Sequence, residues 1–186
     1  MAIFPVILDS CVLYPMYLRD TLLRAAQAGL YRVHWSEEIL AGAFRNLIKD
    51  ERISPKKAEQ LKNLMQTAFP EAMIEVTELL IPCMDNHEGD RHILAAALIA
   101  KAHVIVTDNL KHFPDTSLHQ FNIIAQSSDD FLLSLLDLSP QGMLEVLYLQ
   151  IEATKKPKLT ITGLLDLLNR NTPNFVQKVN SLITNP

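Results

Sequence analysis

The sequence predicts an α/β fold with a short parallel sheet, followed by an all-helical C-terminal extension. Short apolar runs typical of buried strands alternate with longer segments of helical periodicity. The segments between successive strands are long enough for the helical crossovers that parallel pairing requires. After residue 126 the strand pattern stops and only helical segments follow. Together these observations favour one α/β domain with a helical addition.

Local patterns place the strands and helices of the α/β part. The first strand is a continuous apolar run, which suits a strand covered on both faces of a parallel sheet. Gly29 is a natural helix terminator, and Ser36 and Ser54 stand where helix N-caps are favoured. The predicted strands are residues 3–8, 31–35, 73–76, 104–106 and 121–125. The predicted helices between them are residues 18–29, 37–51, 55–67 and 90–102.

The last third of the chain predicts four further helices. The first runs from Ser127 or Ser128 to Leu136, and the others cover residues 140–154, 160–169 and 174–183. We therefore expect an α/β domain of residues 1–126 and a helical extension of residues 127–186. A segment as short as this extension is marginal as an independently folding unit.

Composition narrows the possible classes of protein. The chain of 186 residues suits one domain of ordinary size, and its 48% apolar and 20% charged residues exclude intrinsic disorder. A net charge of −4 argues against a sequence-specific duplex-binding protein, because neutralising phosphates needs a basic balance. The charge does not exclude an enzyme that meets nucleic acid through metal ions. Two cysteines are too few for a structural zinc cluster.

Two features bear on the location of the protein. The longest apolar run, residues 93–100, is far too short to cross a membrane. The start of the chain has no basic region and reaches Asp9 too early for a secretory signal. We therefore expect a soluble, cytoplasmic protein with no membrane segment.

Three acidic residues follow the predicted strands. Asp9 ends the first strand, Asp90 opens the helix after the third, and Asp108 comes just past the fourth. The carboxyl ends of parallel strands share one edge of the sheet, where open α/β folds bind their ligands. Each acid alone could be a helix cap or a turn residue. Their convergence on one edge instead predicts a candidate site.

Such a group of carboxylates suits a divalent cation. Neighbouring carboxylates repel each other unless a cation lies among them, and Mg²⁺ or Mn²⁺ prefers oxygen ligands. A bound ion can lower the pKa of a water molecule and stabilise the charge on a scissile phosphate. The sequence has neither a Walker motif nor GxGxxG, so phosphodiester hydrolysis is favoured over nucleotide binding. A Rossmann-like cofactor domain, with all three acids acting as caps, ranks last.

The chain also resembles a known family. The stretches LDSCVLYP at 8–15 and DRHILAAALIAKAHVIVTDNLKHFP at 90–114 are similar to PIN domains, the nuclease fold of VapC-type toxins. SSDDFLLSLLDLSP at 127–140 and the stretch at 157–170 resemble the helical extension of one branch. The resemblance implies a three-layer α/β/α fold and a metal-dependent endoribonuclease using Mg²⁺ or Mn²⁺. It also implies that the protein is the toxin of a toxin–antitoxin pair and binds an antitoxin protein. Members of the family are often homodimers, so the resemblance implies a homodimer as well.

The resemblance assigns roles to individual residues. Asp9 and Asp90 match metal-binding aspartates of the family, and Asn109 matches its fourth position. Asp108, immediately before Asn109, could supply the charge there. For contact with RNA the candidates are Arg91, Lys111 and His112, although Arg91 could equally be an exposed residue of the first helical turn.

One departure from the family concerns the helix after the second strand. Ala41 and Gly42 stand where the family carries acidic residues. Glu38 lies four residues before Gly42, on the same helix face but one turn, about 5.4 Å, earlier along the helix axis. Either a neighbour such as Glu38 compensates, or the protein is a catalytically weakened PIN-fold module that binds RNA or protein. The sequence leaves both readings open.

Overall fold

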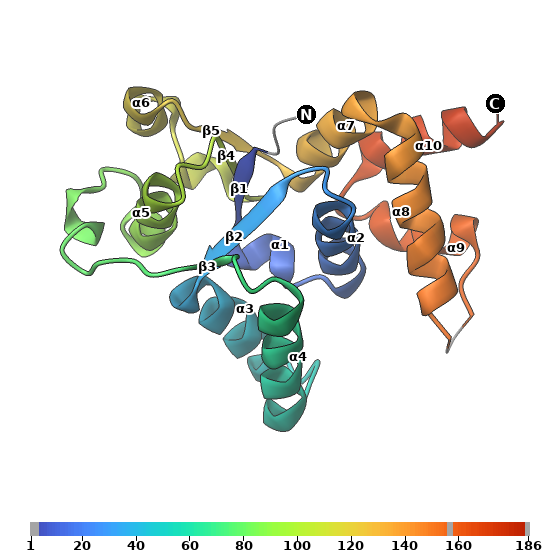
Figure 1. Cartoon of the computed structure of the whole chain (residues 1–186), viewed down its shortest axis with the longest axis horizontal. Coiled ribbons are helices and arrows are strands. Elements are labelled where there is room, and N and C mark those ends of the chain that lie inside the picture. Colours follow the sequence, from blue (N-terminus) through green and yellow to red (C-terminus); the bar gives the residue numbers. More distant parts are fainter. Residues whose placement is uncertain (1–3, 156–157, 185–186) are drawn as a thin grey trace.

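A computed structural model describes residues 4–155 and 158–184, which form a three-layer α/β/α arrangement with a helical extension (Figure 1). The strands are β1 (Pro5–Leu8), β2 (Arg32–Ser36), β3 (Met73–Ile74), β4 (Val104–Val106) and β5 (Ile124–Gln126). The helices of the α/β part are α1 (Ser10–Leu13), α2 (Met16–Gln27), α3 (Glu37–Lys49), α4 (Pro55–Ala68), α5 (Arg91–Ile99) and α6 (Asp115–Leu118). The extension contains α7 (Ser128–Leu138), α8 (Pro140–Ala153), α9 (Ile161–Leu168) and α10 (Pro173–Thr184). Short 3₁₀ turns are η1 (Ile81–Cys83), η2 (Glu88–Asp90), η3 (Leu110–His112) and η4 (His119–Phe121).

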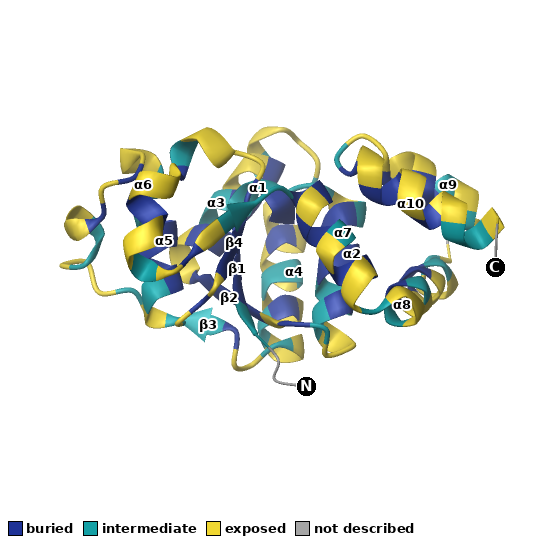
Figure 2. Cartoon of the chain, turned by 90° about the horizontal axis from the view of Figure 1, so that it is seen from above, coloured by how far each residue is buried: buried dark blue, intermediate teal, exposed yellow. Residues whose placement is uncertain are grey.

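The sheet is parallel throughout, in the order β3-β2-β1-β4-β5, as the sequence predicts. In the central strand β1, Val6, Ile7 and Leu8 are fully buried, because helices cover both faces of the sheet. Helix α5 lies on one side, and α2, with the extension beyond it, lies on the other (Figure 1). Figure 2 shows the buried residues concentrated in the sheet and on the inner sides of these helices.

Three helices of the α/β part end at a residue with left-handed backbone. Gly29 (φ 76°) follows α2, as expected, but Glu51 (φ 54°) and Lys101 (φ 51°) take the same position after α3 and α5. In each case the next amide donates back across the turn, for example Ala102 N to Ala97 O at 2.8 Å. Two helices predicted to run to residues 51 and 102 therefore end earlier, at Lys49 and Ile99.

The edges of other elements also differ from prediction. The first strand was expected from Ile3, which lies outside the described residues. The last strand starts at Ile124 rather than Phe121, because η4 and the left-handed Asn122 (φ 56°) come first. Helices α1 and α6 were not predicted, since four residues carry too little periodicity to reveal a helix. None of the helices within residues 4–155 and 158–184 is long and apolar enough to cross a membrane.

The extension packs on α2 and shares its core with the α/β part. Gln150 of α8 is fully buried; its side chain accepts a bond from Thr21 Oγ1 (2.7 Å) and donates to the carbonyl of Tyr17 (3.0 Å). Tyr31 meets Phe131 of α7 edge to face, with ring centroids 5.0 Å apart. These contacts join residues on both sides of position 126, and one apolar core contains residues of both segments. The division into a domain of residues 1–126 and an extension of residues 127–186 therefore stays a prediction from the sequence.

Candidate active site

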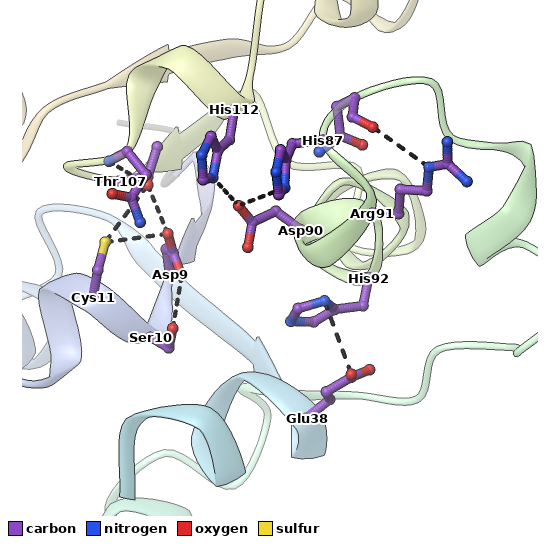
Figure 3. Close-up of polar contacts among 12 residues, drawn as sticks. Asp9, Ser10, Cys11, Glu38, His87, Asp90, Arg91, His92, Thr107 and His112 are labelled. Carbon is purple, nitrogen blue, oxygen red and sulfur yellow. Dashed lines mark hydrogen bonds and ion pairs between the residues drawn. The ribbon is translucent and has the colours of Figure 1, made fainter. Parts of the chain in front are cut away.

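Asp9 and Asp108 follow neighbouring strands at the point where the order of strands reverses. The chain passes from β1 to β2 on one side and later returns to place β4 on the other side of β1. In open α/β sheets, ligands bind at this reversal, beyond the carboxyl ends of the strands. Asp9 directly follows β1, and Thr107 and Asp108 directly follow β4. Helix α5 packs on both strands, which brings Asp90 at its start to the same region (Figure 3).

Asp9 is held by three hydrogen-bond donors. Its carboxylate is buried, with 1% of the residue exposed, and it does not cap the helix that follows. Thr107 Oγ1 donates to Oδ2 at 2.6 Å, Cys11 Sγ to the same oxygen at 3.1 Å, and Ser10 Oγ to Oδ1 at 3.0 Å. Thr107 is itself oriented by the amide of Asn109, which donates to its hydroxyl at 3.0 Å. The carboxylate is therefore fixed in place from both strands.

Cys11 joins the two strands at this point. Burial, and secondly the charge of Asp9, raise the pKa of the Cys11 thiol to about 12. At neutral pH the thiol therefore keeps its proton and donates it to Asp9. The sulfur also accepts a hydrogen bond from the amide of Asp108 at 3.3 Å. The polar role of Cys11 has no signal in the sequence beyond its position two residues after Asp9.

Asp90 lies at the end of η2 and points away from the helix it precedes. Although it takes the N-cap position of α5, its side chain makes no capping bond. Instead Oδ2 lies 2.6 Å from Nδ1 of His112, and His87 stacks on the His112 ring (Figure 3). In the described residues, neither Asp9 nor Asp90 forms an ion pair with a lysine or arginine.

Asp108 turns away from Asp9. Its Oδ1 accepts a hydrogen bond of 2.9 Å from the amide of Ser128, in the first turn of α7. The sequence reading as a turn or capping residue therefore describes this carboxylate, while its second oxygen and the neighbouring Asn109 remain at the edge of the sheet. Asp108 also ties the α/β part to the extension, because it stabilises the positive end of the α7 dipole.

Comparison with known proteins places this fold in a family. Residues 5–111 match the family described as "PIN domain", and residues 128–181 match "VapC50 C-terminal domain". The chain belongs to the PIN-domain family. The protein named "Putative ribonuclease VapC50", from Mycobacterium tuberculosis (strain ATCC 25618 / H37Rv), is 46% identical over 103 residues. The match covers 55% of this chain and 61% of that relative, so this chain spans less than two thirds of its length. No solved structure matches the chain.

In this PIN domain, Gly42 lies beside the acidic site. A Cβ atom added at Gly42 would lie 3.4 Å from Ser10 Cβ and 3.6 Å from Ser10 Oγ, next to Asp9. Position 42 thus faces Ser10, which is bonded to Asp9, and a Cβ atom there would be in van der Waals contact with Ser10. Glu38, one turn earlier, is exposed, and its Oε1 lies 4.0 Å from His92 Nδ1 (Figure 3).

The candidate RNA contacts of this PIN domain have different surroundings. Arg91 is only partly free, since its Nε donates to the carbonyl of Asn86 at 3.4 Å. Lys111 is exposed on η3, whereas His112 is bonded to Asp90. The contact of His112 with RNA stays a prediction, and its bond to Asp90 was not predicted from the sequence. Sequence reasoning missed His87, which lies in an irregular segment where no periodic pattern or motif points to it.

Proposed function

We propose that the protein is a metal-dependent endoribonuclease that hydrolyses RNA phosphodiester bonds, with Mg²⁺ or Mn²⁺ held by Asp9 and Asp90. The observation that carries the proposal is the Asp9 carboxylate, which is buried at the strand reversal with three donors and no cationic side chain as partner in the described residues. A buried carboxylate is costly unless hydrogen bonds or a cation compensate its charge. Membership of the PIN-domain family supports the same reading.

The oxygens present fit such an ion. A carboxylate offers about four acceptor positions, and three donors occupy Asp9, which leaves room for a cation. Asp90 uses one oxygen with His112 and keeps the other. Mg²⁺ needs only one or two protein carboxylates, because water and substrate phosphate complete its shell. The free oxygen of Asp108 and the side chain of Asn109 are proposed to assist.

Different residues of the site have different proposed roles in RNA cleavage. Ser10, Cys11 and Thr107 keep Asp9 in position, so that no reorganisation is needed when RNA arrives. Lys111, exposed beside the edge, would contact a phosphate, and Arg91 would add a second contact. The ion, when bound, would act as a Lewis acid that neutralises charge on the scissile phosphate.

Replacing Asp9 with Asn tests the proposal. The variant keeps the shape of the side chain but removes its charge, so metal-dependent cleavage of RNA should fall by about 100-fold or more. Asp137→Asn, which changes an exposed carboxylate on α7, is the matched control and should cleave like the unmodified protein. Asp9→Asn should unfold at a lower urea concentration than Asp137→Asn, because an amide nitrogen cannot accept the hydrogen bonds of the carboxylate oxygen it replaces; cleavage is therefore compared without urea, where circular dichroism shows that both variants are folded. Unchanged cleavage by Asp9→Asn would refute the proposal.

Gly42 supports a second candidate, a catalytically weakened PIN module that binds RNA or protein without turnover. The family's acidic residue is missing at a position that faces Ser10, which is bonded to Asp9. Gly42→Glu separates the two candidates when cleavage is compared across Mg²⁺ and Mn²⁺ concentrations. A large gain over an inert parent supports the weakened module, whereas similar cleavage by both supports an active enzyme in which Glu38 or another acid compensates.

We also propose that the protein is the toxin of a type II toxin–antitoxin pair, acting in the cytoplasm as a homodimer. Support comes from the two family matches and from the relative named as a VapC protein. The antitoxin would dock an amphipathic helix near the acidic edge and present a basic residue to the carboxylates. Purification from the native host tests this: a second, small protein should accompany the chain, and recovery of the chain alone would contradict it.

A further inference from the structure

Two histidines and one aspartate converge next to the site of Asp9. His87 precedes η2, Asp90 ends it, and His112 ends η3. Backbone bonds fix the two turns together, since the amide of His87 donates to the carbonyl of His112 (3.2 Å) and the amide of Asp90 donates to that of His87 (2.9 Å). The placement of these side chains is thus set by the backbone.

Both imidazoles direct the same type of nitrogen at one carboxylate oxygen. Nδ1 of His112 lies 2.6 Å and Nδ1 of His87 lies 4.0 Å from Asp90 Oδ2. The rings are stacked with centroids 3.9 Å apart and planes 9° from parallel (Figure 3). Parallel rings at this separation are compatible with offset stacking, which aromatic rings prefer, so the stacking alone requires no ligand. The feature that points to a ligand is that both Nδ1 atoms face the same carboxylate oxygen.

The potential ligand atoms of His87, Asp90 and His112 all lie within 4.8 Å of one another. Asp90 and His112 are largely covered, with side-chain exposures of 20% and 23%, whereas His87 is 56% exposed. The group is therefore anchored on one side and open to solvent on the other. An entering ion would keep positions for water beside the three protein ligands.

We propose that His87, Asp90 and His112 form a binding site for one zinc-class divalent ion. Two imidazoles and a carboxylate are ligands that Zn²⁺ accepts, with water in the remaining position. Mg²⁺ prefers oxygen ligands in an octahedral shell, so it competes poorly for two histidines. The site shares Asp90 with the ion proposed for RNA cleavage, but it requires neither Asp9 nor nuclease activity.

Zinc binding by the full chain, without a histidine tag, tests the site directly. Isothermal titration with Zn²⁺ should give one ion per chain, and equilibrium dialysis should show that Mg²⁺ at equal concentration does not displace it. His87→Ala and His112→Ala should each weaken binding at least about 10-fold. His119→Ala removes an exposed histidine of η4 outside the group and should bind like the unmodified chain.

Asp9→Asn distinguishes this site from the nuclease proposal. The variant should keep its affinity for Zn²⁺ within about twofold even where it loses RNA cleavage. Zn²⁺ should also raise the thermal midpoint of the unmodified chain and leave that of His87→Ala unchanged, which shows that the variant is folded and lacks the site. Absence of a stoichiometric ion, equal binding by His87→Ala, or joint loss in Asp9→Asn would each overturn the proposal.

Discussion

Thr107 should contribute more to stability than its size suggests, because its hydroxyl donates to a buried charge. In Thr107→Val the 2.6 Å bond to Asp9 Oδ2 is lost, and a methyl group lies against the carboxylate instead. A hydrogen bond to a charged group is worth about 1.5–3 kcal/mol. The amide of Asn109 also loses its acceptor, which adds about 0.5–1 kcal/mol. We expect the free energy of unfolding to fall by about 2–4 kcal/mol in total.

Thr172→Val provides a matched control for this effect. Thr172 is equally buried, but its hydroxyl donates to the neutral carbonyl of Leu168 at 3.1 Å, so the same substitution should cost only about 1 kcal/mol. Urea unfolding measures both, and a cycle that combines Thr107→Val with Asp9→Asn should give a coupling energy of about 1 kcal/mol or more. Equal losses in the two valine variants, with no coupling to Asp9, would refute the charged hydrogen bond as the cause.

Three shorter predictions concern the extension and the cysteines. Asp129→Asn should lower the free energy of unfolding by about 2 kcal/mol, because the carboxylate accepts three hydrogen bonds from the start of α10. Urea unfolding measures this change, and a loss below about 0.5 kcal/mol would contradict the prediction. Gln150→Leu should make the extension more susceptible to limited proteolysis, since the two hydrogen bonds between Gln150 and α2 are lost and Thr21 Oγ1 keeps only its bond to the carbonyl of Tyr17. The variant Cys83→Ser removes the exposed cysteine, so that Ellman's reagent reports on Cys11 alone. At pH 8 the reagent should react with Cys11 only after unfolding, because a pKa of about 12 leaves roughly one thiol in 10⁴ as thiolate. Rapid reaction of the folded variant would contradict this prediction.

The sheet and the position of Asp9 could be predicted because they depend on few physical choices. The apolar runs of β1 and β4 leave no polar face, so both strands must be buried inside the sheet. Parallel strands end at one edge whatever the lengths of their crossovers. The residue after β1 therefore meets the residues after β4, as the bond between Thr107 and Asp9 confirms.

Other parts of the site depend on single-residue geometry that the sequence does not reveal. Thr107 and Asp108 are neighbours at the end of a strand, where successive side chains point in opposite directions. Thr107 turns to Asp9, and Asp108 consequently turns to Ser128 of α7. His87 and His112 are brought together by the backbone bond from the amide of His87 to the carbonyl of His112, which no periodic pattern encodes. Helix ends at Glu51 and Lys101 were missed because neither is the glycine that usually marks them.

Gly42 offers no ligand to the proposed metal site, and the hydrogen bonds that hold Asp9 do not depend on it. Asp9 keeps its donors from Ser10, Cys11 and Thr107, none of which depends on a side chain at Gly42. The Cβ of a new residue would lie 3.4 Å from Ser10 Cβ, a side-chain contact that leaves the backbone of the strands untouched. Electrostatic catalysis relies on groups that are positioned before the substrate binds, so we expect that the single substitution Gly42→Glu suffices to add a ligand to the proposed metal site.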